Sequence, residues 1–475
     1  MRWPICLRLL ILIHFIAILP VGCMAEVKEP AVAGQFYPAG EDTLRRNVDG
    51  YLARAGNSAV EGKLVAIVSP HAGYEYSGGV AAWAYKRLEG SNIRTVVIIG
   101  PSHHVAFEGV AVYAEGSMRT PLGNIRINEA AARSLLDEKS GIAFNRAPFA
   151  REHSLEVQLP FLQRTLKEFS IVPILVGTPT RESFLSLTES LTRLLRTDDR
   201  ALLVISSDLS HYHDAATAGT MDRKVIEALE RLSPVRMEQL LASGEGEMCG
   251  GYPAIYAMAV TRNLGATNGI LYRYADSGDV TGDKGSVVGY AAMGIYKTPL
   301  SAARKAQLLA LAKETLHAQV MGTKLPDPDV NDSLLKADGA SFVTINDRNG
   351  RLRGCIGNIM PVMPLYRSVI TNAVSAGSRD PRFAPVTAAE LPDLRVEVTI
   401  LSPLEPLRDI KEIRIGTHGL YLEKGPNSGV FLPQVAIEQG WDLPTYLAEL
   451  ARKAGLPPDG WRDGKLYTFT AEIIK

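Results

Sequence analysis

Three short apolar runs in the first half of this chain each end directly before a turn that carries histidine. They are residues 64–68, before His71; residues 95–99, before His103 and His104; and residues 201–205, before His211 and His213. Each run has about five residues, is rich in Val and Ile, and is followed by Pro, Gly or Ser, as in strands buried on both faces of a parallel sheet. A fourth run, 171–176, also ends at a glycine but carries no histidine.

Stretches with helical spacing, at 81–88, 129–136 and 184–195, separate these runs. Strands that alternate with helices predict an α/β fold with a mainly parallel sheet. Ligands of such sheets bind outside the carboxyl ends of the strands, so the histidines are expected to converge on one pocket. The alternative is that each histidine only caps a strand or closes a turn.

Length and charge limit the classes of function. The 475 residues suggest two to three domains at about 150 residues each. Lys plus Arg equals Asp plus Glu, at 51 each, so no overall field favours nucleic acid or an anionic membrane. No nucleic-acid partner is therefore expected.

The N-terminal 25 residues predict export. Arg2 and Arg8 precede an apolar segment, 9–19, which is followed by small residues and is short for a transmembrane span. Cleavage after Ala25 and acylation of Cys23 at a lipobox-like sequence are competing outcomes, and an uncleaved anchor is the third. A lipid on Cys23 would be the only membrane attachment expected.

The pattern of predicted strands and helices changes near residue 297. Residues 286–295 suggest a closing strand, and 302–320 a helix with Ser301 as N-cap. We therefore expect a signal at 1–25, a first domain at 26–297 and a second at 298–475. Runs 340–345 and 351–356 flank a polar connection ending in Asn-Gly and predict a β-hairpin. A further strand, 395–401, and helices at 365–376 and 443–454 make this half α+β.

Several polar residues could carry chemistry. Glu152 next to His153 could orient a ligand histidine, or could simply begin a helix. Asp208 and His211 lie three residues apart just past a strand, where such a pair can act as acid or base near neutral pH. Cys249, beside two glycines, offers a thiolate if a metal or cation lowers its pKa.

These residues resemble the Memo family, also called AmmeMemoRadiSam system protein B. The resemblance covers about 27–296 and rests on six segments in order: PHAGYEYSG at 70–78, GPSHH at 100–104, EHSLEVQ at 152–158, SSDLSH at 206–211, CG at 249–250 and DSGDVTG at 276–282.

The resemblance implies a fold similar to that of the class III extradiol dioxygenases, which are non-haem iron enzymes. It maps the metal ligands to His71, His103 and Cys249, with Asp208 and His211 beside them. A cysteine replaces the carboxylate of the dioxygenases, so ring cleavage does not carry over. Two imidazoles and a thiolate suit a divalent metal, with iron expected first and copper or zinc as alternatives.

The second half resembles the AMMECR family, AmmeMemoRadiSam system protein A. The segments are LRGCIG at 352–357, DPRF at 380–383, LPQ at 432–434 and GW at 440–441. In a strand, Arg353 and Cys355 share one face. They could form an anionic-ligand or nucleophile site, although a buried structural cysteine is an equal alternative.

The sequence thus indicates a fusion of two such domains. One hypothesis is a mononuclear redox metalloenzyme in which His211, Asp208 and His153 are candidate catalytic residues acting on an unknown small molecule. The alternative is a metal-binding or protein-recruiting module without turnover. The resemblances also imply a radical SAM partner protein, although export conflicts with the reducing compartment that radical SAM chemistry needs.

Overall fold

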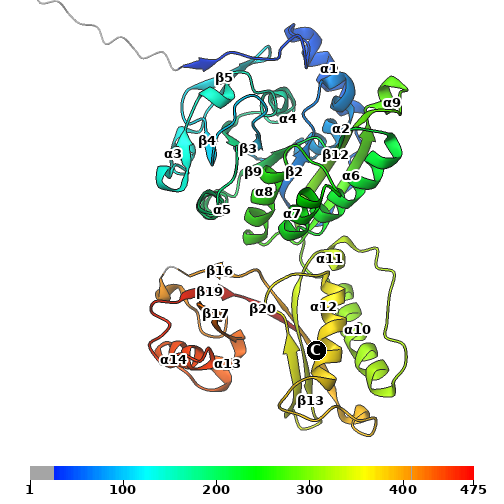
Figure 1. Ribbon diagram of the computed structural model, residues 1–475, viewed down its shortest axis with the longest axis vertical. Coiled ribbons are helices and arrows are strands. Elements are labelled where there is room, and N and C mark those ends of the chain that lie inside the picture. Colours follow the sequence, from blue (N-terminus) through cyan, green and yellow to red (C-terminus); the bar gives the residue numbers. More distant parts are fainter. Residues whose placement is uncertain (1–25, 408) are drawn as a thin grey trace, which may run out of the picture.

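The computed structural model describes residues 26–407 and 409–475, and its first part is built on a large mixed sheet (Figure 1). In the described residues the sheet has nine strands, in the order β10-β12-β2-β9-β3-β8-β4-β7, with β11 also paired to β12. The four predicted runs form its centre and are mutually parallel: β2 (Lys63–Ser69), β9 (Ala201–Ser206), β3 (Thr95–Pro101) and β8 (Ser170–Val176). The prediction of these four strands is therefore confirmed.

The flanks of this sheet are largely antiparallel, which the sequence did not indicate. Strand β12 is antiparallel to β2, β10 and β11, and β4 is antiparallel to β8, while β7 is parallel to β4. Their bounds are β4 (Val110–Val112), β7 (Ile142–Phe144), β10 (His211–His213), β11 (Asn268–Asp276) and β12 (Val287–Lys297). The expectation of a mainly parallel sheet thus holds only for the centre.

Two groups of helices pack around this sheet. One group is α1 (Glu41–Arg54), α2 (Tyr74–Tyr85) and α4 (Leu159–Thr165); the other is α5 (Arg181–Thr197), α6 (Ala215–Glu230), α7 (Pro234–Ser243) and α8 (Gly251–Asn263). The remaining elements are short: α3 (Glu129–Arg133), α9 (Gly278–Thr281), and a small sheet of β1 (Val27–Lys28), β5 (Ser117–Thr120) and β6 (Gly123–Arg126).

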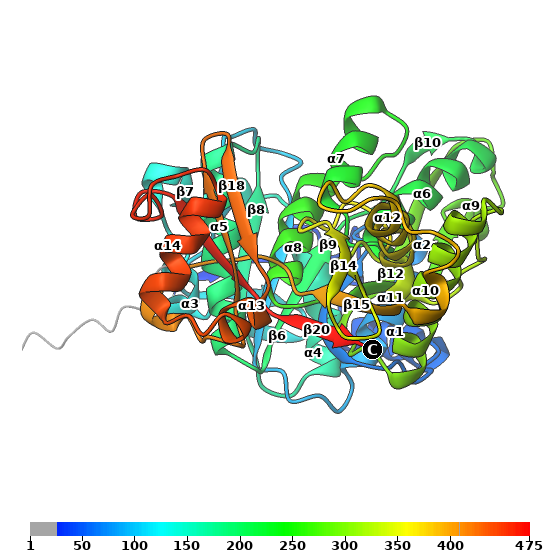
Figure 2. The same ribbon diagram turned by 90° about the horizontal axis from the view of Figure 1, so that it is seen from below.

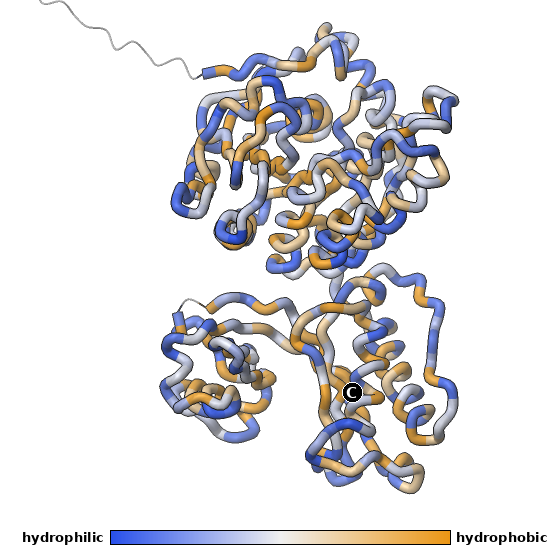
Figure 3. The backbone as a smooth tube through the Cα atoms, in the orientation of Figure 1, coloured by the Kyte–Doolittle hydropathy of each residue, from blue (hydrophilic) through white to orange (hydrophobic). Residues whose placement is uncertain are grey.

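Burial explains why the central runs are so apolar. Every residue of β3 is buried, because neighbouring strands cover its edges and helices cover the sheet. Figure 3 shows the hydrophobic segments gathered inside the first part and the hydrophilic ones on its periphery. Helix α5 begins at a capping box, in which Thr180 and Ser183 each bond the other's backbone N–H, so its start is encoded locally.

The second part has two small sheets. Strands β13 (Ala340–Asn346), β14 (Leu352–Gly357), β15 (Arg395–Leu401) and β20 (Ala471–Ile474) form one; β16 (Glu405–Pro406), β17 (Gly419–Lys424), β18 (Asn427–Phe431) and β19 (Lys465–Phe469) form the other. Its helices are α10 (Ala302–Met321), α11 (Ser333–Lys336), α12 (Leu365–Ser378), α13 (Pro433–Glu438) and α14 (Leu443–Lys453). The β13–β14 hairpin and the Ser301 N-cap of α10 are as predicted.

The two parts meet at the amino ends of β2 and β9 (Figures 1 and 2). The buried side chain of Asp338 accepts two hydrogen bonds from Arg231 across the junction, and Arg196 pairs with Glu405. A cavity of about 740 Å³ lies here, lined by residues of both parts, including Leu64 at the start of β2. Since β2 has seven residues, its far end, where His71 follows, lies about 20 Å away.

Candidate metal centre

His71 follows the carboxyl end of β2 and is almost fully buried, with 1 % of its surface exposed. Its backbone N–H donates to Asp208 Oδ1 at 2.8 Å, and its ring Nδ1 lies 2.9 Å from Ser206 Oγ. Burial, reinforced by the charges of His103 and His153, lowers the pKa of His71 well below its usual value. The imidazole is therefore neutral at pH 7, as a metal ligand must be.

His103 follows the end of β3 and is held by Glu152. One carboxylate oxygen lies 2.8 Å from ring Nδ1, and the other accepts the backbone N–H of His103 at 2.6 Å. Burial alone would raise the pKa of Glu152, but the hydrogen bonds from His103 lower it to about 2. An ionised carboxylate can only accept, so Nδ1 carries a hydrogen and Nε2 is the ring nitrogen left to face a ligand.

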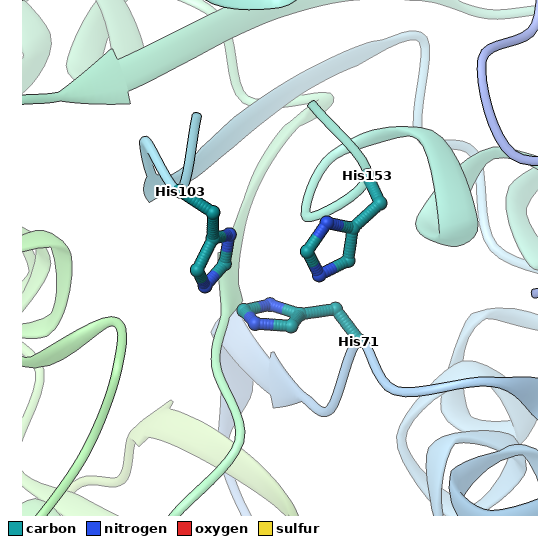
Figure 4. A group of neighbouring side chains, drawn as sticks. All are labelled: His71, His103 and His153. Carbon is teal, nitrogen blue, oxygen red and sulfur yellow. The ribbon is translucent and has the colours of Figure 1, made fainter. Parts of the chain in front are cut away.

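His153 completes a group of three imidazoles that converge on one point (Figure 4). One ring nitrogen from each of His71, His103 and His153 can be chosen so that all lie within 4.8 Å of one another. The ring of His153 stacks on that of His103, with centroids 4.6 Å apart. Burial lowers the pKa of His153 to about 4, so this ring is neutral at pH 7 as well.

Cys249 lies beside His71, in the segment before α8. Its Sγ lies 3.1 Å from His71 Nε2 and accepts the backbone N–H of Asp208 at 3.2 Å. Tetrahedral ligation with metal–sulfur and metal–nitrogen bonds of about 2.3 and 2.0 Å would place these two ligand atoms about 3.5 Å apart. The observed spacing is a few tenths of an ångström shorter, so a small shift lets both atoms bind one ion. Burial raises the pKa of the Cys249 thiol to about 12.

Asp208 and His211 have different surroundings. Asp208 Oδ1 accepts the backbone N–H groups of His71 and Ala72, and burial raises the pKa of this carboxyl to about 7. Asp208 thus fixes the loop that carries His71. His211 lies at the start of β10, where its backbone donates to Glu247 and burial lowers the pKa of its ring. No hydrogen bond between the Asp208 and His211 side chains occurs in the described residues.

A segment near the N-terminus, residues 27–37, lies against the site. The buried Glu156 carboxylate accepts hydrogen bonds from the backbone of Ala31 and Val32 and from the hydroxyl of Tyr37. This anchoring places the Phe36 ring against that of His153, with centroids 4.6 Å apart. Phe36 therefore covers one side of the histidine cluster.

Arg353 and Cys355 lie on β14 in the second part, away from the histidines. Arg353 is engaged by Glu390 in an ion pair of 2.7 Å and by the carbonyl of Ala384. Cys355 Sγ is half-buried, lies 3.3 Å from Thr344 Oγ1, and has a pKa that burial raises. Neither side chain is a free, activated group in this structure.

The predicted export signal, with Cys23 and Ala25, lies outside the described residues. Within 26–407 and 409–475, no helix is both long and apolar enough to cross a membrane.

Sequence reasoning missed two features of the cluster. It gave His153 a catalytic place, whereas the ring belongs to the group that could hold the metal ion. It also paired Glu152 with an unspecified histidine, and the partner proves to be His103, 49 residues away. The only available signal was the adjacent Glu152-His153 pair, which does not reveal a contact between distant segments.

Comparisons with known proteins find matches to both parts. The family model described as "Memo-like protein" matches residues 28–294, and the model described as "AMMECR1" matches 309–474. A MEMO1 family protein of Methanopyrus kandleri is 37 % identical over 278 residues, covering 56 % of this chain and 98 % of that protein. One from Aquifex aeolicus is 39 % identical over 271 residues, with the same coverage. A solved structure of an uncharacterized protein from Pyrococcus horikoshii is 40 % identical, covers 35 % of this chain and 88 % of its own, and has a TM-score of 0.34.

Proposed function

Because the chain belongs to the Memo-like protein family, we propose that its cluster of three histidines and Cys249 holds one redox-active divalent metal ion. The observation that carries this proposal is the convergence of imidazole nitrogens from three separate segments, with a thiol from a fourth segment beside one of them. His71, His103 and His153 supply imidazole nitrogens, and Cys249 Sγ lies beside His71 Nε2. A structural role alone gives no reason to bring three imidazoles together with a thiol beside one of them, His71 being fully buried.

Iron is the metal we favour, with copper and zinc as alternatives. His71 and His103 lie at the carboxyl ends of parallel strands, which supports the proposed relationship to the extradiol dioxygenases. The first part would then use iron for a similar type of chemistry. When bound, such an ion would exchange electrons with a small organic substrate or with oxygen. Imidazole and thiolate donors also suit copper, so the ligands alone do not fix the metal.

The residues around the ion have separable tasks. Glu152 orients His103, and Asp208 holds the loop of His71. His211 lies next to the cluster and is part-buried, with a lowered pKa, so it could accept a proton from a substrate at neutral pH. Phe36 shields the His153 side from water. The unknown substrate would then reach the ion from the side that His211 borders.

The test is anaerobic reconstitution of the full chain with Fe(II), followed by oxygen uptake in the presence of a panel of aromatic diols. The wild type should consume oxygen, and Cys249→Ala should not. Cys355→Ala is the matched control, because it removes the other described free thiol and should leave uptake unchanged. Absence of oxygen uptake and of any spectral change by the iron-loaded wild type would count against a redox centre.

A second candidate is a metal-binding module without turnover. In its favour, Cys249 Sγ lies beside His71 Nε2, so three imidazoles and a thiolate would fill a tetrahedral shell if all four bound one ion, as in structural sites with no open position. Cobalt(II) spectra distinguish the two, because an open or five-coordinate site should change on addition of azide or cyanide. A closed four-coordinate site should not change.

Three expectations from the sequence remain proposals. We propose that the chain is exported, with either cleavage after Ala25 or acylation of Cys23, which fractionation and labelling with radioactive palmitate would test. We propose that the AMMECR1 domain helps to bind substrate. We also propose a radical SAM partner protein, which co-purification from cells under anaerobic conditions would test.

A further inference from the structure

Behind His71 lies a chain of buried polar groups that forms no part of the cluster itself. It runs from Tyr85 through Gln158 to Ser206 and reaches ring Nδ1 of His71. We propose that Gln158 and Ser206, together with the Ser154 carbonyl, lock His71 in the tautomer that carries its hydrogen on Nδ1. These are positioning residues, and they act on the metal only through His71.

The first step is the orientation of the Gln158 amide. Its Nε2 lies 3.0 Å from the carbonyl oxygen of Pro70, which can only accept a hydrogen bond. The amide nitrogen must therefore face Pro70, and Oε1 faces the hydroxyl of Tyr85, which donates to it at 2.6 Å. The flipped amide would bring two acceptors together. The second Nε2 hydrogen then points to Ser206 Oγ, 2.8 Å away.

The second step is the direction of the Ser206 hydroxyl. A serine has one hydrogen to donate, and the backbone carbonyl of Ser154 is within hydrogen-bond distance of Ser206 Oγ. Gln158 Nε2 also lies 3.4 Å from this carbonyl, but its two hydrogens go to the closer Pro70 and Ser206 oxygens, so the Ser206 hydrogen goes to the carbonyl. Ser206 Oγ therefore meets His71 Nδ1, 2.9 Å away, with a lone pair, so Nδ1 must be the donor.

Burial makes this assignment rigid. Ser154, Gln158 and Ser206 are each at most 1 % exposed, so water cannot replace any of the three partners. The assignment is also independent of the charge on the ring, because Nδ1 keeps its hydrogen in both the neutral and the protonated forms. The consequence is that Nε2, which faces Cys249 Sγ at 3.1 Å, presents its lone pair to the cluster.

Both His71 and His103 thus carry a hydrogen on Nδ1, but different groups accept it. His103 is fixed by an anionic carboxylate, whereas His71 is fixed by a neutral serine–amide relay. A neutral relay adds no negative charge next to the fully buried His71, where an unpaired carboxylate would be costly. An imidazole without such a lock exchanges between tautomers and would present N–H to a metal for part of the time, which weakens apparent affinity.

The relevance to metal binding rests on the proposed function, but the tautomer itself is measured without metal. The experiment is ¹⁵N spectroscopy of the metal-free full chain labelled at histidine, with the His71 signals identified by their loss in His71→Ala. The wild type should show a protonated Nδ1 and an unprotonated Nε2. In Ser206→Ala, hydrogen on Nε2 should appear, because Nδ1 has lost its acceptor.

Two further variants keep the result interpretable. Ser190→Ala removes a buried hydroxyl that bonds only within α5, and it should leave the His71 signals unchanged. Gln158→Met removes the amide that donates to Ser206 Oγ, and it should give a mixture of His71 tautomers. This variant tests the proposal even if Ser206→Ala does not fold. Hydrogen on Nε2 in the wild type, or an unchanged His71 tautomer in both folded variants, would overturn the lock.

Metal binding supplies the second readout. With Zn²⁺ as the probe, Ser206→Ala should bind about 10- to 100-fold more weakly than the wild type, the usual effect of removing a partner of a ligand histidine. Ser190→Ala should bind as the wild type does. A wild-type protein with hydrogen on Nδ1 that binds no metal would refute the proposed function and leave the tautomer lock standing. Equal Zn²⁺ affinity in a Ser206→Ala protein with the changed tautomer would refute the link between them.

Discussion

The thiol of Cys249 makes a quantitative prediction about pH and metal affinity. Burial raises its pKa to about 12, so it is protonated across the neutral range. The pKa values of His71 and His153 are lowered by burial, that of His153 to about 4, so both rings are already neutral above pH 7. A metal that binds the thiolate must therefore displace one proton, and that proton comes from Cys249.

The number of protons released on metal binding sets how steeply the affinity depends on pH. Release of one proton makes the affinity rise about tenfold per pH unit, which is about 1.4 kcal/mol per unit. Between about pH 7.5 and 9.5 the wild type should therefore gain about a hundredfold in Zn²⁺ affinity. Cys249→Ala lacks the proton and should bind more weakly, with an affinity that hardly changes over the same range.

The assay is competition for Zn²⁺ against a chromophoric chelator at several pH values, with proton release followed by an indicator dye in weak buffer. Cys355→Ala is the control and should keep the wild-type slope, since that thiol lies in the second part of the chain. A tenfold slope that survives in Cys249→Ala would show that the proton comes from elsewhere. A flat wild-type profile would show that the thiol stays protonated and does not bind the ion.

Three other predictions concern groups around the cluster. Glu152→Gln removes the charge that orients His103, and the Zn²⁺ dissociation constant should rise about 10- to 100-fold in chelator competition; an unchanged constant would deny Glu152 this role. Glu156→Ala breaks the buried anchor of residues 27–37 and should lower the local stability there by about 3 kcal/mol. Hydrogen exchange at the Val32 amide measures this, and unaltered protection would mean that the segment is held otherwise. His153→Phe should reduce the acid sensitivity of the metal-free first domain, because a folded pKa of about 4, below the unfolded value of 6.5, costs stability as pH falls from 6.5 to 4. Denaturant titrations at several pH values give the slope of the free energy of unfolding against pH, which should differ between the two proteins by at most about 1.4 kcal/mol per pH unit. Equal slopes would show that His153 titrates normally.

The local patterns predicted the centre of the fold well. Buried runs such as 95–99 became β3, and the amphipathic stretch from 184 became α5, because burial on both faces or on one face leaves a direct mark on the sequence. The antiparallel flanks were not predicted. Strand β12 carries a buried, continuous apolar run like those of the parallel strands, so nothing local distinguishes its direction.

The candidate site was also predicted from the sequence only in part. Strand ends placed His71 and His103 near each other, since the carboxyl ends of parallel strands share one edge of the sheet. The contact of Glu152 with His103 depends instead on how the loop after β7 returns to that edge. The role of Asp208 was also hidden, because its partner is a backbone N–H group, and a sequence does not show which backbone groups need a partner.

Metal content is the decisive measurement for the proposed binding of one metal ion at the histidine–cysteine cluster. The full chain would be purified anaerobically from its native compartment, and metals would be quantified per chain in the wild type and in His71→Ala. The wild type should contain about one ion per chain, iron in the first instance, and a folded His71→Ala protein should contain none. Equal metal content in both proteins, or a wild type that neither retains nor takes up any transition metal, would contradict it.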